Sequence, residues 1–256
     1  MGCARGGECM IPMQYALRRR MMNRILQLFY YGLAPELSVR RERLAATAVG
    51  NYALFGGGRN GTNYLSTVDA YDTSLTRTTP TALSVARHML AAIAVGNHAL
   101  FGGGYGSGYS STVDAYDTSL TRTTPTALSV ARGYLVATAV GNHALFGGGY
   151  NGTDRLSTVD AYDTSLTRTT PTALSVICAP FATTVGNYAL FGGGYNGTDH
   201  LSTVDAYDTS LTRTTPTALS VARDGLSATT VGNYALFGGG YNGTDRLSTV
   251  DAYQVK

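Results

Sequence analysis

The chain reads Tyr52-Ala53-Leu54-Phe55-Gly56-Gly57-Gly58 and, after a polar loop, Val68-Asp69-Ala70-Tyr71. Both segments return four more times. The glycine triplet begins at Gly56, Gly102, Gly147, Gly192 and Gly238, and the second segment ends at Tyr71, Tyr116, Tyr162, Tyr207 and Tyr253. The two markers keep step at a fixed period, which predicts a modular array or ring whose units bury apolar faces against one another.

One unit predicts four strands. In the first unit these are Leu44 to Val49, Tyr52 to Phe55, Ser66 to Tyr71 and Thr76 to Thr79. Gly50-Asn51 suits the positive φ of a tight hairpin turn, and the third strand alternates apolar and polar residues. Pro80 then ends the pairing, as expected at a sheet edge. Each unit is therefore predicted to be a four-stranded antiparallel meander without helix.

Four strands in a unit of this length predict the blade of a β-propeller. The two quoted segments also resemble those of kelch-repeat propellers, in which an apolar strand closes on a glycine pair and a later strand carries a tyrosine. The resemblance covers roughly Gly32 to Tyr253. Kelch repeats usually place a tryptophan about seven residues past the tyrosine, whereas this chain has no tryptophan and carries Arg77 or Thr78 there. We therefore expect the outer strand to pack more thinly or differently.

The two ends of the sequence predict how the ring closes. The last unit stops after Tyr253 with Gln254-Val255-Lys256 and so lacks a fourth strand, whereas Leu37 to Arg41 aligns with Leu83 to Arg87. This alignment places Tyr31 to Ala34 on a fourth strand. We expect an all-β, five-bladed β-propeller of four-stranded antiparallel blades, closed by the N-terminal strand completing the last blade and hiding two edges. The alternative is a fragment of a larger ring.

The domain prediction has two parts: residues 1–28 are a leader, disordered or a short helix, and residues 29–256 are the kelch-like propeller. Four arginines precede an apolar stretch in the leader, in the manner of a signal peptide. Gln27 interrupts that stretch and Tyr30 lies within it, so we do not expect secretion by this segment. A cytoplasmic location and a surface or virion-associated one both stay open.

Composition excludes several classes of function. Charged residues make up 14% and the net charge is +3, which argues against a nucleic-acid partner. The sequence has no apolar run long enough to span a membrane. Three cysteines, Cys3, Cys9 and Cys178, do not form a disulfide framework, and we expect free thiols.

The five copies differ from one another mainly in two places, the loop after the glycine triplet and the connection between units. In an up-and-down blade both places lie on the same edge. Their tyrosine, histidine and arginine side chains are types favoured in binding sites. The candidate ligand-binding residues are Arg59, Tyr64, His88, Tyr105, Tyr109, Tyr134, Tyr150, Arg155, Phe181, Tyr195, His200, Tyr241 and Arg246. The alternative is that these loops simply tolerate sequence drift.

No catalytic residue set emerges, and we expect no metal and no cofactor. His98 and His143 occupy equivalent positions but lack a third ligand. The aspartate of each Val-Asp-Ala-Tyr segment predicts a repeated structural hydrogen bond. Arg87, Arg132 and Arg223 end three connections, with Cys178 at the fourth position; they either tie neighbouring units together or hold a carboxylate ligand. The Asn-Gly-Thr sequences are explained as turns.

Function follows from these features only as an expectation. The leading hypothesis is a noncatalytic binding module, a monomeric ring that recognises a protein or a glycan with one rim, as in a surface adhesin or a phage tail component. The second is an enzyme similar to kelch-type propellers such as sugar oxidases or sugar-acid isomerases. The third is a structural assembly module.

Overall fold

The computed structural model describes residues 30–255, so the predicted leader, residues 1–28, lies outside the described part. Residues 30–255 contain strands, turns and loops but no helix. Accordingly, this part of the chain has no helix with the length and apolar character needed to cross a membrane. The expected all-β class is confirmed.

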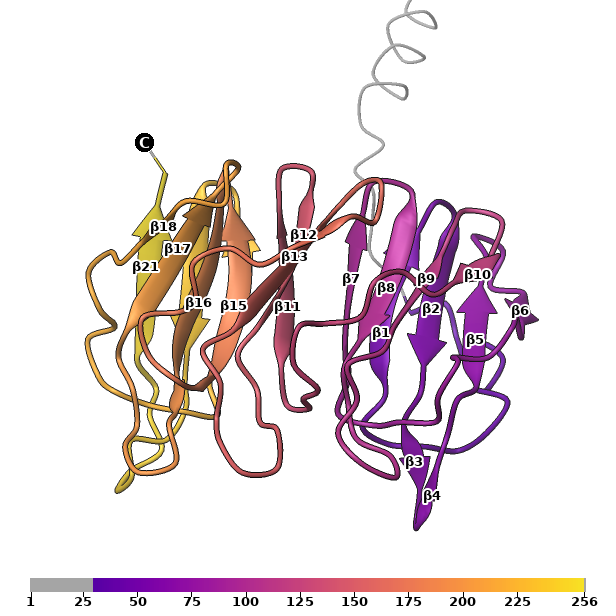
Figure 1. Ribbon diagram of the computed structural model, residues 1–256, viewed down its shortest axis with the longest axis horizontal. Coiled ribbons are helices and arrows are strands. Elements are labelled where there is room, and N and C mark those ends of the chain that lie inside the picture. The colour runs from indigo at the N-terminus through magenta and orange to yellow at the C-terminus, as the bar shows by residue number, and fades with distance from the viewer. Residues whose placement is uncertain (1–29, 256) are drawn as a thin grey trace, which may run out of the picture. The chain divides into compact units, whose positions relative to one another are not determined.

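Each sequence repeat forms one antiparallel sheet (Figure 1). The first sheet contains β1 (Ala45–Val49), β2 (Tyr52–Gly56), β5 (Val68–Tyr71) and β6 (Arg77–Thr78), and the second contains β7 (Ala91–Val95), β8 (His98–Gly102), β9 (Val113–Tyr116) and β10 (Arg122–Thr123). The third contains β11 (Val136–Val140), β12 (His143–Gly147), β13 (Val159–Asp163) and β14 (Arg168–Thr169), and the fourth contains β15 (Ala179–Val185), β16 (Tyr188–Tyr195), β17 (Val204–Asp208) and β18 (Arg213–Thr214). The fifth contains β19 (Ser227–Val231), β20 (Tyr234–Gly238) and β21 (Val250–Gln254). A small sixth sheet pairs β3 (Arg59–Asn60) with β4 (Asn63–Tyr64).

Glycine sets both the turn and the packing distance of each sheet. Gly50 has a φ of 53° in the turn that pairs Val49 with Tyr52, as the Gly-Asn pair predicts. Gly56, the first of the triplet, lies against the next sheet, where an added Cβ would come within 2.7 Å of the Phe101 ring. The repeated spacing of the triplet therefore lets a phenyl ring lie directly on the strand before it.

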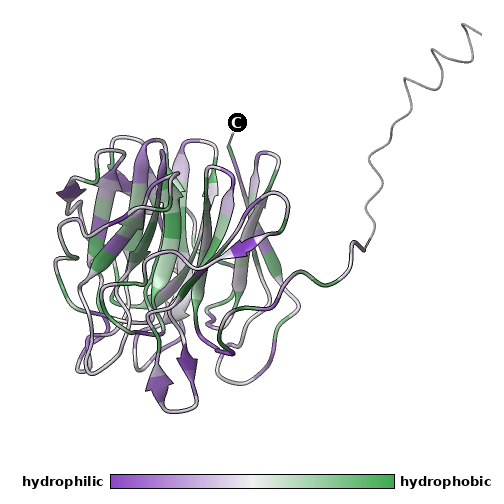
Figure 2. Ribbon diagram, turned by 90° about the vertical axis from the view of Figure 1, so that its right-hand side faces the viewer, coloured by the Kyte–Doolittle hydropathy of each residue, from purple (hydrophilic) through white to green (hydrophobic). Residues whose placement is uncertain are grey.

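The hydrophobic core is divided into four clusters, each between two successive sheets. In the first, Leu54, Val68 and Ala70 of the first sheet pack against Phe101 and Tyr116 of the second. The same types of residue meet at the next three interfaces. Figure 2 shows hydrophobic ribbon along the strands and hydrophilic ribbon at the projecting β3–β4 hairpin. The second, third and fourth sheets thus each give one face to the sheet before them and the other to the sheet after them.

The tyrosine that ends each Val-Asp-Ala-Tyr segment fastens one unit to the preceding one. The Tyr116 hydroxyl donates a hydrogen bond to the Thr81 carbonyl oxygen at 2.6 Å. Tyr162 and Tyr207 donate in the same way to Thr126 and Thr172. Burial, and secondarily the neighbouring aspartate, raises the pKa of all three phenols well above the usual range.

The raised pKa values of these phenols predict that the chain loses stability at alkaline pH. The folded chain keeps them neutral, whereas in the unfolded chain they ionise near pH 10. Stability is therefore full below about pH 10 and falls as pH rises further, by about 1.4 kcal/mol per pH unit for each tyrosine. Tyrosinate absorbance and circular dichroism, followed together with increasing pH, are expected to change in one joint transition. A gradual rise in absorbance at constant circular dichroism would contradict this prediction, and Tyr116→Phe is expected to make the decline shallower.

The predicted closure by an N-terminal strand is wrong. The fifth sheet has three strands among the described residues, residues 31–34 form no strand, and Leu33 is 93% exposed. Where the repeat has Arg77 and Thr78, the aligned positions hold Tyr31 and Gly32. Tyr31 lacks the guanidinium that bonds to the sheet's aspartate, and Gly32 has a φ of 123°, which a regular strand does not use. The sheets are consequently not closed, although their repetition fits a β-propeller.

Candidate functional site

The two variable regions meet at one edge of the sheets, as predicted. In the second unit, Tyr105 follows the glycine triplet and pairs with Tyr109 across the loop. Tyr105 also exchanges two backbone hydrogen bonds with His88 of the connection, at 2.9 and 2.8 Å. Equivalent pairs join Arg59 with Glu42, Tyr150 with Gly133, and Tyr241 with Asp224. The loop and the connection therefore form one surface in each unit.

Side chains of this surface follow one another across the units in a series that we call the aromatic row, in which Tyr150 and Arg155 are joined by backbone pairing. Its members are Tyr64, His88, Tyr105, Tyr109, Tyr150, Arg155, Tyr195, His200 and Tyr241. The Tyr64 ring stacks on His88 with centroids 5.0 Å apart, and Tyr105 meets Tyr109 edge-on at 5.0 Å. Tyr109 then contacts Tyr150 of the next unit at 5.6 Å. Such edge-to-face pairs favour a defined arrangement of the rings.

In the fourth and fifth units the row contains charged and histidine side chains as well as tyrosine rings. The Arg155 guanidinium lies 5.1 Å from the centre of the Tyr195 ring, a cation–π distance. His200 contacts Tyr195 and Tyr241, with centroids at 5.2 and 5.5 Å. His200 Nε2 also lies 3.4 Å from the Asp224 carboxylate, which places an acidic group beside the rings. Aromatic faces, hydroxyls and both signs of charge therefore share this edge.

The loops that carry the row are held by their own hydrogen bonds. The Asn151 side chain accepts hydrogen bonds from the backbone N–H groups of Thr153 and Asp154, at 2.9 and 2.7 Å. The Tyr150 hydroxyl donates to the Gly152 carbonyl oxygen at 2.7 Å. The loops that follow Tyr195 and Tyr241 repeat all three bonds. The turn interpretation of Asn-Gly-Thr is confirmed, and the tyrosine rings are positioned before any ligand arrives.

Four candidate residues lie outside the row. Arg59 is paired with Glu42 at 2.8 Å, and Arg246 is exposed at the far end of the row. Tyr134 is 49% exposed and lies close to Tyr109. Burial raises the pKa of Tyr109, and the nearby Tyr134, Tyr150 and Tyr105 raise it further. Phe181 does not project from the edge, because it packs against the core between the fourth and fifth sheets. Phe181 pairs with Gly192 in the position that Ala91 holds in the second sheet, where side chains face the core.

Sequence reasoning left two roles open for the connection arginines: tying neighbouring units together, or holding a carboxylate ligand. Their contacts show the first role. The Arg87 side chain is fully buried, and its Nη2 bonds to the Asp114 carboxylate at 2.8 Å and to the Phe101 carbonyl oxygen at 3.0 Å. Burial lowers the pKa of Arg87, and Asp114 opposes that shift. Arg132 and Arg223 make the same bonds. These side chains tie each connection to the following sheet and are not presented to a ligand.

A second arginine completes the aspartate cluster of each of the first three sheets. Arg122 Nη1 lies 3.1 Å from Asp114, and the Ser84 backbone N–H donates to the same carboxylate at 3.0 Å. Arg122 stands in the outer strand, near the position at which kelch repeats place their tryptophan. The outer strand is therefore attached by a charge-assisted hydrogen bond instead of a large ring. The predicted structural hydrogen bond of the repeated aspartate is confirmed.

The fourth connection is the exception, because Cys178 replaces the arginine. Burial, and secondarily Asp205, raises the pKa of the Cys178 thiol to about 12, so the thiol stays protonated near neutral pH. Asp205 keeps the bonds from Arg213 and Ser175. Within residues 30–255 no group of three or more metal-ligating side chains comes together.

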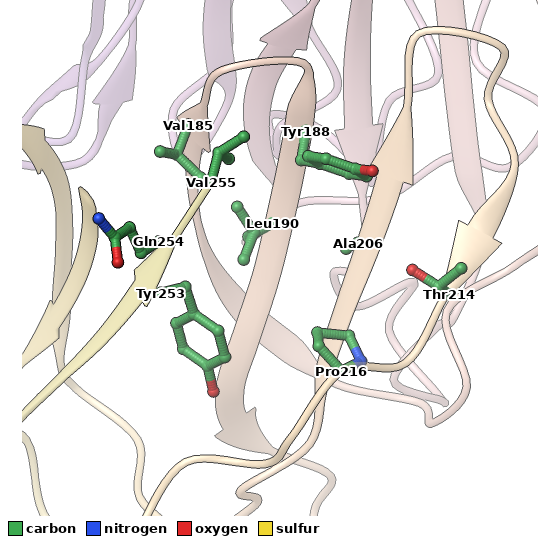
Figure 3. Close-up of a pocket in the computed structure, with 9 residues that line it drawn as sticks. All are labelled: Val185, Tyr188, Leu190, Ala206, Thr214, Pro216, Tyr253, Gln254 and Val255. Atoms are coloured by element: carbon green, nitrogen blue, oxygen red, sulfur yellow. The ribbon is translucent and has the colours of Figure 1, made fainter. Parts of the chain in front are cut away.

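A pocket of about 430 Å³ lies between the fourth and fifth sheets, at the edge opposite the row. Its lining consists of Val185, Tyr188, Leu190, Ala206, Thr214, Pro216, Tyr253, Gln254 and Val255 (Figure 3). At the first three interfaces, Leu120, Leu166 and Leu211 pack in the corresponding place. Sequence reasoning did not predict this pocket as a site.

Comparison with protein-family models found no match, and comparison with curated proteins found none either. The candidate site therefore rests on its own geometry.

Proposed function

We propose that this chain is a noncatalytic recognition module that binds a glycan along the aromatic row. The observation that carries the proposal is two series of ring contacts, one from Tyr64 to Tyr150 and one from Tyr195 to Tyr241. Arg155 lies between the two series: it pairs with Tyr150 through the backbone and places its guanidinium over the Tyr195 ring. The apolar C–H face of a sugar ring packs on an aromatic face. The hydroxyl groups around the sugar ring need hydrogen-bond donors and acceptors beside the aromatic face, and tyrosine hydroxyls and charged groups supply them. The row offers both along one edge.

Preorganisation supports the same function. Hydrogen bonds within their own loops hold the rings of Tyr150, Tyr195 and Tyr241, so these rings lose little side-chain entropy when a ligand binds. The repeated spacing of the row also matches a ligand with repeated units, since successive rings then engage successive sugars with additive effect. A kelch-like propeller, with the sequence features quoted above, is our interpretation of the scaffold that presents this edge.

The test is a glycan array with the purified chain, followed by titration of the best ligand. Tyr109→Ala and Tyr150→Ala are each expected to weaken binding at least tenfold, because buried aromatic contacts at the centre of an interface contribute most of its affinity. Tyr234→Ala is the matched control, since this half-exposed tyrosine lies at the opposite edge and is expected to leave affinity unchanged.

Two outcomes contradict the proposal. One is a blank array from a sample whose circular dichroism shows β-structure, which would favour a protein ligand instead. The other is glycan binding that survives both row substitutions, which would place the ligand elsewhere on the chain.

A further inference from the structure

The fifth sheet has an apolar face that no described residue covers. Val231 is 61% exposed and Val250 is 59% exposed, and Leu236 is partly exposed between them. The equivalent residues of the fourth sheet are Val185, Val204 and Leu190, which are all buried against the fifth sheet. In every other sheet, the equivalent face packs against the next sheet along the chain. In the fifth sheet, this face is exposed to solvent.

The first sheet presents the opposite face. Ala53 is exposed and Phe55 is partly exposed, whereas the equivalent Ala99 and Phe101 are fully buried against the first sheet. Leu37, which aligns with the buried Leu83, is also partly exposed. This is the face that every other sheet gives to its predecessor. The two ends of the array therefore carry the two halves of one interface.

Backbone groups show the same complementarity. At the first internal interface, Leu83 N–H donates to the Ser66 carbonyl oxygen at 2.8 Å, and Gly58 N–H donates to the Arg87 carbonyl oxygen at 2.9 Å. Both bonds recur at the other three interfaces, between Leu128 and Ser111, Leu174 and Ser157, Leu219 and Ser202, Gly104 and Arg132, Gly149 and Cys178, and Gly194 and Arg223.

The equivalent groups at the ends are Leu37 N–H and the Arg41 carbonyl on the first unit, with the Ser248 carbonyl and Gly240 N–H on the fifth. None of these four makes such a bond within the described residues. A buried interface between the two ends would complete them, and unpaired backbone groups at a buried surface are otherwise unfavourable.

We propose that the fifth-sheet face of one chain binds the first-sheet face of a second copy, end to end. The occupant is a second copy because this chain carries the complementary face, with the same residues and backbone bonds as its four internal interfaces. Within residues 30–255 the sheets are not closed on each other, and no described residue covers either face. Such a head-to-tail contact produces a closed ring of copies or a growing filament. It is an alternative to the monomeric ring that the sequence predicts.

The junction would also extend the aromatic row. At each internal interface the residue opposite the loop tyrosine contacts the next unit, as Tyr109 contacts Tyr150. By the same geometry Arg246 of one copy would approach Arg59 of the next, whose charge is already paired with Glu42. The exposed Glu42 carboxylate would then lie between two guanidinium groups.

The experiment measures molar mass by light scattering and sedimentation across a concentration series of the full chain without ligand. Val250→Lys blocks the fifth-sheet face, and Ala53→Lys blocks the first-sheet face; each alone is expected to weaken association at least tenfold. An equimolar mixture of the two variants retains one intact face of each kind, so we expect a discrete complex of two chains. Ser119→Lys, in an exposed turn, adds the same charge and is expected to associate like the wild type.

Each other result overturns the proposal. A wild-type chain that stays monomeric up to about 100 μM, where weak specific interfaces form, shows that the ends do not bind copies. If Ala53→Lys alone self-associates as strongly as the wild type, the first-sheet face is not part of the contact, and two copies bind through the same face instead. If Val250→Lys fails to fold, Val231→Glu tests the same face. Because no glycan is present, failure here is independent of failure of the proposed function.

Discussion

Replacing Asp114 by asparagine is expected to destabilise the folded chain by about 3–5 kcal/mol, because it leaves the buried Arg87 guanidinium without its counter-charge. Asp114 is fully buried and accepts hydrogen bonds from Arg87, Arg122 and Ser84. Asparagine has nearly the same shape but offers one acceptor oxygen and no charge. Urea denaturation followed by circular dichroism measures the loss as a lower midpoint.

Asp205→Asn provides the matched comparison. Asp205 lies at the same position two sheets further along, but Cys178 stands where the buried arginine would be, and Arg213 is partly exposed. We expect a loss of about 1–2 kcal/mol, the usual cost of weakened hydrogen bonds without a stranded charge. Equal losses at the two sites would contradict the idea that the buried arginine makes the aspartate indispensable.

Replacing Phe101 by alanine is also expected to cost about 3–5 kcal/mol, through lost transfer free energy and the cavity left behind. The Phe101 ring is fully buried, packs on the first sheet directly over Gly56, and meets Tyr116 edge-on at 5.9 Å. Neighbouring backbone cannot easily collapse into the space, since the sheet on each side is held by its strand pairing. The midpoint of urea or thermal denaturation measures the effect.

Phe55→Ala tests the same substitution at the end of the array. Phe55 occupies the equivalent strand position, but no preceding sheet covers it, so we expect a loss below about 1.5 kcal/mol. The comparison is made at a concentration where the chain is monomeric. A loss as large as that of Phe101→Ala in the monomer would show that the first-sheet face is covered within one chain, and so would argue against an open end.

Sequence alone was sufficient for the features that depend on neighbouring residues. The Gly50-Asn51 turn, the alternation up to Tyr71 and the stop at Pro80 each act over a few positions. They predicted the strands of the five main sheets, but not the short β3–β4 pair, which lies in a segment predicted to be a polar loop. The loop and connection at one edge also followed, because an up-and-down meander leaves only one choice of edge. The repeated aspartate was predicted to bond within the structure for the same reason: a residue copied into every unit meets the same surroundings.

Tertiary structure decided what depends on contacts between distant residues. Closure failed because Tyr31 and Gly32 cannot reproduce the outer-strand bond that Arg77 makes, and a sequence alignment does not measure that bond. Phe181 belonged to the core because strand register turned it inward. The arginines became buried partners of the aspartates, and separate tyrosines became one row, only when neighbouring sheets packed. Local chain geometry thus specifies the unit, whereas burial and charge pairing between units determine the site and leave the two end faces open.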